Sequence, residues 1–144
     1  MPPLAADQPY VFSNVETLLV GFLSTRSELE GIPVLVDVSD AYDGASVTVA
    51  VTRIGGEFAE DDLLDHALIR IDTYAQDKQT ALDIAGLVRG LIWLMPSVAL
   101  PGGYAVSDVA EAKGPTCLRD PRYASVHRYM TKYHILVRVG PVIA

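Results

Sequence analysis

Residues 64–95, LDHALIRIDTYAQDKQTALDIAGLVRGLIWLM, hold the clearest pattern in the chain and decide its fold class. Polar and apolar side chains alternate over residues 64–75, which predicts a strand with one buried face. Asp77 then stands where a helix N-cap is expected, and apolar residues recur at helical spacing as far as Met95, before Pro96. The stretch therefore predicts a strand that leads directly into an amphipathic helix.

That helix also carries apolar residues outside its main stripe, namely Leu82, Leu87, Trp93 and Leu94. We therefore expect the helix to bury a second side in addition to its core face. Gly86 and Gly90 lie four residues apart on one face of the helix, where they would let another backbone come close.

The residues before this stretch predict the rest of a hairpin. Alternation in residues 46–53 predicts a strand that pairs with residues 64–75 in an antiparallel arrangement. The acidic residues 55–62, which include Gly55 and Gly56, are expected to form an extended connection at the tip. Residues 33–38 predict a further short strand.

The N-terminal part of the chain predicts an arm followed by a helix. Residues 1–12 contain three prolines and are expected to form an irregular arm, and residues 13–144 a single domain. Ser13 and Glu16 have the spacing of a capping box, which predicts a helix that ends before Gly31.

After the long helix, residues 104–112 predict a strand, residues 114–121 an irregular segment and residues 123–139 a long final strand. One face of the final strand is expected in the core, and the other, largely basic face in contact with solvent or a partner. The strands come in hairpins, in the order α, β, β, β, α, β, β. This order predicts an α+β fold, with a mainly antiparallel β-sheet, two principal helices packed on one face and a long β-hairpin before the second helix.

The composition excludes several classes of protein. Eighteen acidic and 11 basic residues give a net charge of −7, which argues against a general nucleic-acid binder. The single cysteine, Cys117, excludes an internal disulfide. No apolar run approaches the roughly 20 residues that span a bilayer, so no membrane contact is expected. The first 12 residues lack the pattern of a signal peptide.

The sequence contains none of the common catalytic or cofactor motifs: phosphate loop, GxGxxG or GxSxG. His127 and His134 lie seven residues apart, on opposite faces of one predicted strand, so they cannot share a metal ion. We therefore expect no enzyme activity, no cofactor and no metal. A thiol-dependent site at Cys117 with a nearby histidine stays open, although a lone cysteine is more often a small buried side chain.

Charge is distributed unevenly along the chain. Residues 28–65 contain ten acids and one base, whereas residues 113–139 contain six bases and one acid. Two patches of opposite charge on one subunit favour a head-to-tail contact, which closes into a ring if the rotation between subunits allows it. The candidate interface residues are Arg53, Glu57, Phe58, Glu60, Asp61, Asp62, Arg119, Arg122, Arg128, Lys132 and Arg138. The N-terminal arm and Phe58 are included as contacts between neighbours because neither has an obvious place in the core of its own subunit.

Several short stretches occur in a characteristic order along the chain. They are residues 15–19 (VETLL), 31–34 (GIPV), 51–56 (VTRIGG), 67–75 (ALIRIDTYA), 79–85 (QTALDIA), 114–115 (GP), 118–121 (LRDP) and 128–129 (RY). Their order and spacing resemble those of the tail terminator (tail completion) proteins of long-tailed bacteriophages, especially phages that infect actinobacteria. The resemblance spans most of the chain, and none of the stretches is a catalytic signature.

The resemblance implies a structural virion protein that forms a homo-hexameric ring, caps the tail tube and stops its polymerisation. The ring would also offer a joining surface to the head-to-tail connector or stopper protein, and DNA would pass through its lumen without sequence-specific binding. The implied location is the tail–neck junction of the virion, with assembly in the host cytoplasm. Because an acidic lumen suits the passage of DNA, Arg128, Lys132 and Arg138 are expected to meet an acidic neighbour.

Two alternatives stay open. Another head–tail neck component, such as a stopper, an adaptor or a head completion protein, has a similar size and α+β composition. A small ligand-binding domain or a cysteine-dependent enzyme is an alternative of a different class.

Overall fold

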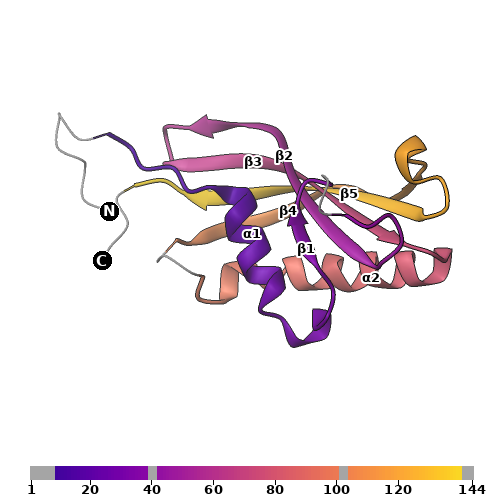
Figure 1. Ribbon diagram of the computed structural model, residues 1–144. Coiled ribbons are helices and arrows are strands. Elements are labelled where there is room, and N and C mark those ends of the chain that lie inside the picture. The colour runs from indigo at the N-terminus through magenta and orange to yellow at the C-terminus, as the bar shows by residue number, and fades with distance from the viewer. Residues whose placement is uncertain (1–8, 39–41, 101–103, 141–144) are drawn as a thin grey trace.

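A five-stranded sheet with the strand order β1–β2–β3–β5–β4 is the framework of the computed structural model, which describes residues 9–38, 42–100 and 104–140 (Figure 1). The strands are β1 (Val34–Val36), β2 (Thr48–Ala59), β3 (Leu64–Ala75), β4 (Val106–Leu118) and β5 (His127–Arg138). β1 runs parallel to β2, and the other three neighbouring pairs are antiparallel. The prediction of a mainly antiparallel sheet is confirmed.

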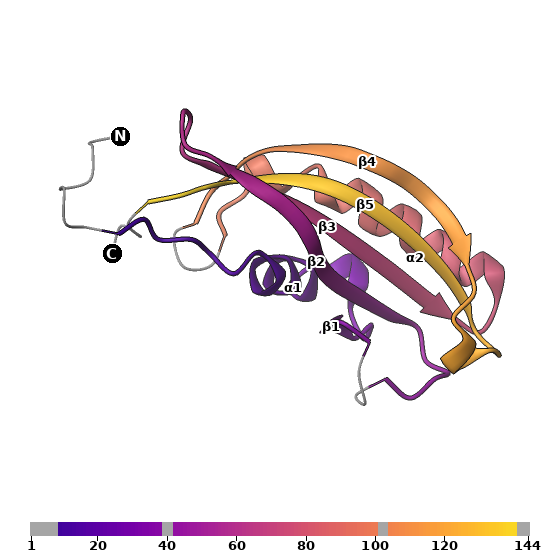
Figure 2. The same cartoon turned by 90° about the horizontal axis from the view of Figure 1, so that it is seen from above.

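Two helices cover one face of this sheet, as predicted for an α+β fold. α1 (Val15–Ser24) lies against β1 and β2, and α2 (Lys78–Ile92) lies against β3, β5 and β4 (Figure 2). Short 3-10 turns follow or join these elements: η1 (Ser27–Leu29), η2 (Met95–Ser97) and η4 (Pro121–Tyr123). Within the described part of the chain, no helix is long and apolar enough to cross a membrane.

The core lies between the helices and the sheet face that they cover. Alternate residues of the central strands point into it, for example Ile69 and Ile71 on β3 and Ile135 on β5, all at most 1% exposed. Leu19 of α1 and Ile92 of α2 join the same apolar cluster and are fully buried. The face of the final strand that the sequence assigned to the core is therefore buried as predicted.

α2 begins as predicted but exposes the side that was expected to be buried. The Asp77 carboxylate accepts hydrogen bonds from the backbone N–H of Thr80 (2.9 Å) and from its hydroxyl (2.7 Å). The expected second buried side is wrong for Leu82, Trp93 and Leu94, which are 38%, 50% and 40% exposed. Leu87 is partly buried and packs against the core.

The capping box predicted for α1 is wrong. The N-cap is Asn14, whose Oδ1 accepts from the backbone N–H of Thr17 at 3.1 Å. Glu16 instead accepts from the backbone N–H of Arg53, 37 positions along the chain, at 2.8 Å. The tertiary contact to β2 thus takes the carboxylate that the local pattern assigned to the cap. The Ser13 hydroxyl is buried and has no hydrogen-bond partner among the described residues.

The hairpin predicted from the sequence is present, but its turn is shorter than expected. β3 has the predicted bounds, and β2 continues through Gly55 and Gly56 as far as Ala59, so residues 55–59 are strand and not connection. A β-bulge between Arg53 and Gly55 shifts the register, so that both glycines remain within the strand. Gly56 has φ +107°, and a Cβ built there would overlap the carbonyl oxygen of His66 and lie 2.9 Å from the N of Leu68.

The second half of the chain also contains more strand than predicted. β4 runs through residues 114–118, which were expected to be irregular, because it is an edge strand with several register shifts. Pro115 fits there, since edge strands and bulges tolerate a residue without a backbone N–H. β5 begins at His127, so residues 123–126 of the predicted final strand lie outside it, and Tyr123 belongs to η4.

Candidate assembly interface

The sheet face opposite the helices, called the open face here, carries a group of charged side chains. Alternation along the strands places Arg70 and Asp72 of β3, and Arg128 and Lys132 of β5, on this face. The register sets Arg70 opposite Lys132, and Lys132 opposite Lys113 of β4. These three residues, the basic row, are thus cations in adjacent positions across three neighbouring strands.

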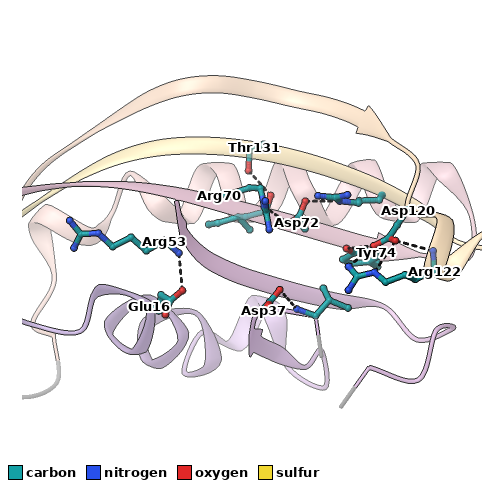
Figure 3. Close-up of polar contacts among 12 residues, drawn as sticks. Glu16, Asp37, Arg53, Arg70, Asp72, Tyr74, Asp120, Arg122 and Thr131 are labelled. Carbon is teal, nitrogen blue, oxygen red and sulfur yellow. Dashed lines mark hydrogen bonds and ion pairs between the residues drawn. The ribbon is translucent and has the colours of Figure 1, made fainter. Parts of the chain in front are cut away.

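Asp72 holds two arginines together beside the basic row. It is 1% exposed, and its Oδ2 accepts from Arg70 Nε and its Oδ1 from Arg128 Nε, both at 2.8 Å (Figure 3). One carboxylate between two guanidinium groups leaves the cluster with a formal positive charge. Arg128 is further held by the ring of Tyr74, with its guanidinium carbon 5.9 Å from the ring centroid.

A second polar cluster lies on the open face at the C-terminal end of β3. The Tyr74 hydroxyl donates to Asp120 Oδ2 (3.3 Å), and Arg122 donates to both carboxylate oxygens of Asp120 (3.1 and 2.8 Å) (Figure 3). The Arg122 guanidinium lowers the pKa of Asp120 to about 2, and burial raises the pKa of Tyr74. Tyr42 packs against Tyr74, with ring centroids 5.1 Å apart, so this end is closed by the chain itself.

Stability at acid pH is expected to depend on Asp120. A carboxyl whose pKa falls from 3.8 to about 2 on folding stabilises the native state above pH 3.8, and this contribution is lost as the pH falls towards 2. Because Arg122 is exposed and screened, we expect a contribution of about 1 kcal/mol. Urea unfolding at pH 7 and near pH 2.5 should show a loss for the wild type that is smaller in Asp120→Asn.

The hairpin tip carries the exposed carboxylates of Glu60, Asp61 and Asp62, called the acidic tip here. Asp62 Oδ1 accepts from the backbone N–H of Leu64 (3.2 Å), and its Oδ2 lies 3.9 Å from His66 Nε2. Glu57, on the strand before the turn, is also exposed. The acidic candidates therefore gather at the end of the β2–β3 hairpin.

Several other candidate residues have partners within their own chain. Arg53 forms a two-pronged ion pair with the buried Asp65, with both N–O distances at 2.7 Å. Phe58 packs edge-on against Tyr10 (5.3 Å between centroids) and Phe12 (5.0 Å). The expectation that Phe58 and the arm lack a place on their own subunit is therefore wrong for residues 9–12, while residues 1–8 of the predicted arm lie outside the described residues.

The remaining basic candidates are divided over the molecule. Arg122 pairs with Asp120 and Arg128 with Asp72, so both arginines have a carboxylate partner within the chain. Lys132 is half-buried, and Arg119 and Arg138 are exposed; none of the three has an ion-pair partner among the described residues. Arg138 lies opposite Leu64, near the hairpin tip, and Arg119 lies beyond β4 at the other end.

Sequence reasoning missed Arg70 and Lys113 as members of the basic row. Arg70 was visible on the polar side of the alternating stretch 64–75, and Lys113 was counted in the basic segment. Only the register between strands β3, β5 and β4 shows that the two flank Lys132. No signal in a single sequence reports that register.

Cys117 and the histidines are the groups that the sequence analysis considered for chemistry. Cys117 is exposed on the edge strand β4, opposite Tyr129, so the usual role of a small buried side chain is wrong for it. Among the described residues its sulfur has no hydrogen-bond partner, and no three His, Cys, Asp or Glu side chains converge as metal ligands. An open groove of about 600 Å³ lies along residues 24–34, where Arg26 and Glu28 pair with each other at 2.9 Å.

Comparison with known proteins gives a fold relationship. No protein-family model matches the chain, and no curated protein matches it. Among solved structures, the chain is similar to one from "Virion of native gene transfer agent (GTA) particle", with 16% sequence identity and a TM-score of 0.62. The match covers 85% of this chain and 93% of the other. The two chains therefore share a fold over nearly their whole length.

Proposed function

We propose that the chain is a structural virion protein of a phage-like particle, and that it acts as a tail terminator. In this role it forms a hexameric ring that caps the tail tube, stops its polymerisation and provides the joining surface to the head connector. The observation that carries the proposal is the fold shared with a chain of a gene transfer agent virion, over 93% of that chain.

The arrangement of the resembling stretches supports the same role. Residues 67–75 lie in the central strand β3, and residues 79–85 form the first half of α2, so the two longest stretches that resemble tail terminators lie in the sheet centre and on its covering helix. None of them contributes to a cleft with converging reactive groups among the described residues. The proposal accordingly assigns an assembly role to the chain and no catalytic one.

The distribution of charge supports assembly through unlike surfaces. Exposed acids occupy the hairpin tip and the segment around β1, where Glu28, Glu30 and Asp37 lie. Cations occupy β5, with Arg128, Lys132 and Arg138, and Lys113 lies on the neighbouring edge strand β4, which also carries Asp108 and Glu111. A ring with rotational symmetry needs two different surfaces on each subunit, and this separation supplies them.

The proposal is tested by the mass of the protein in solution, with negative-stain images of the same fractions. We expect closed rings, which weaken as salt rises beyond about 0.15 M, where the screening length falls to about 8 Å. Because a tube end can template a ring, the same protein is added to a polymerising tail-tube protein, and the tubes should then become capped and arrested in length. A protein that stays monomeric and leaves tube length unchanged would overturn the proposal.

A further inference from the structure

We propose that the acidic tip of one copy docks on the basic row of a second copy of the chain. The contact joins Glu60, Asp61 and Asp62 of the hairpin to Arg70, Lys132 and Lys113 on the open face. The inference rests on the proposed function in that this contact is the one that would link neighbouring subunits of the ring.

The basic row is an unfavourable arrangement in an isolated subunit. Like charges that lie directly opposite each other on neighbouring strands destabilise a sheet, and here two such pairs, Arg70–Lys132 and Lys132–Lys113, share one residue. Among the described residues, the carboxylate that binds a member of the row on the open face is Asp72, and it is already shared between Arg70 and Arg128. Glu111 of β4 lies on the helix side, where it pairs with Arg89 at 2.8 Å. An anionic partner would remove the repulsion.

The chain's own acidic tip cannot supply that partner. Six residues separate Leu64, at the start of β3, from Arg70, and a strand rises about 3.4 Å per residue, so about 20 Å lies between them. The end of the hairpin projects away from the sheet (Figure 2). Contact between the tip and the row therefore requires a second copy.

The charges of the two surfaces match. Asp72 with the four cations Arg70, Arg128, Lys132 and Lys113 gives a formal charge of +3. The acidic tip carries three carboxylates and no cation.

The tip is also held in place before it binds. Asp62 closes the turn by accepting from Leu64, and the hairpin behind it is braced by the Arg53–Asp65 ion pair and by the aromatic contacts of Phe58. Such preorganisation reduces the entropy lost on docking.

DNA phosphates are the competing anion for the basic row. The chain as a whole carries a net charge of −7, which repels a nucleic acid. The acidic tip, by contrast, is present on every copy at the same concentration as the row. The observations therefore favour the second copy, and DNA is retained as an outcome of the test.

The test uses charge reversal on each surface and then on both. The tip variant is Glu60→Lys with Asp61→Lys, which leaves Asp62 to close the turn. The row variant is Lys113→Glu with Lys132→Glu, which leaves Arg70 and Arg128 to hold Asp72. Each variant should weaken assembly at least about tenfold, whether read as ring formation or as the concentration needed to cap tubes. A chain that carries both the tip and the row substitutions should recover most of the assembly, because the two surfaces again have opposite charges.

A double variant on α2, Lys78→Glu with Asp83→Lys, is the matched control, since both residues are exposed and lie away from the two surfaces. It should assemble like the wild type, and circular dichroism should show that all variants are folded. If the wild type forms rings or caps tubes but either reversal leaves assembly unchanged, or the combined variant is not restored, the inference fails while the proposed function stands. If the wild type does neither, both fail. If the row variant assembles normally but loses binding to a short DNA duplex, the basic row belongs to DNA and the inference is overturned.

Discussion

Gly56→Ala is expected to destabilise the fold by about 4 kcal/mol. The backbone at Gly56 has φ +107°, which costs an alanine about 1–3 kcal/mol. The new Cβ would also overlap the carbonyl oxygen of His66 and lie 3.0 Å from the Cα of Ala67, and such overpacking costs about 1–3 kcal/mol more. Both obstacles are backbone atoms of β3, so the hairpin must open to admit the methyl group. Urea unfolding, followed by circular dichroism, measures the loss.

Gly86→Ala is the matched control, because the same methyl group is added at a site with nothing within 4 Å. Gly86 lies on the exposed side of α2, where alanine is a better helix former than glycine by about 1 kcal/mol. The two substitutions should therefore change stability in opposite directions. Equal losses at both positions, or a neutral effect at Gly56, would contradict the close approach of β2 and β3 at the bulge.

Asp72→Asn is expected to cost about 3 kcal/mol of stability. The substitution keeps the size of the side chain but removes the one negative charge between Arg70 and Arg128. Arg128 is 16% exposed and the Arg70 side chain 30%, so neither cation is fully hydrated once its partner is gone. Breaking a buried ion pair from one side costs about 3–5 kcal/mol, and the partial exposure of the arginines places this case at the lower end.

Asp83→Asn on α2 provides the baseline for the same chemical change at an exposed position, and should stay within about 0.5 kcal/mol of the wild type. Adding Arg128→Met to Asp72→Asn should recover part of the lost stability, because it removes one of the two arginines left without a carboxylate partner. A loss below about 1 kcal/mol for Asp72→Asn, with no recovery in the double variant, would mean that the cluster does not hold β3 to β5.

The sequence predicted the fold best where the decisive interactions are local. β3 has the predicted bounds, and α2 begins at the predicted cap, because strand alternation and the Asp77–Thr80 hydrogen bonds lie within a few residues of each other. The helix ends at Ile92, before the predicted end at Met95, and Met95 and Pro96 lie in the 3-10 turn η2.

The errors come from contacts between distant residues. Glu16 was assigned to a local cap, but it binds the backbone of Arg53, 37 positions away. Gly55 and Gly56 indicated a turn, whereas the bulge keeps them in β2. The predicted irregular segment is also partly strand, because β4 is an edge strand and can continue through Pro115. Local patterns cannot report whether a neighbouring strand continues alongside.

For the same reason, the sequence predicted the exposure of some candidate interface residues and missed the intrachain partners of others. The acidic tip is a run of consecutive residues, so its exposure follows from the turn alone. The basic candidates depend on partners far along the chain: Arg128 is held by Asp72, 56 positions away, and Arg53 by Asp65. Which cations remain available for an assembly contact is decided by the order of the strands, and the sequence does not state that order.

The strand order also bears on how the chain folds as it is synthesised. β3 lies at the centre of the sheet, yet its partner β5 comes after α2 and β4, and the hydrogen bond from Thr131 to Ile71 joins residues 60 positions apart. A nascent chain that has emerged only as far as α2 holds the β2–β3 hairpin with one edge of β3 unpaired, and such edges promote aggregation. At about 5–20 residues per second, the ribosome takes about 2–9 s to proceed from the end of α2 to the end of β5. The fraction of newly synthesised chains that folds, instead of aggregating, would therefore depend on how well the unpaired edge of β3 is protected during this interval.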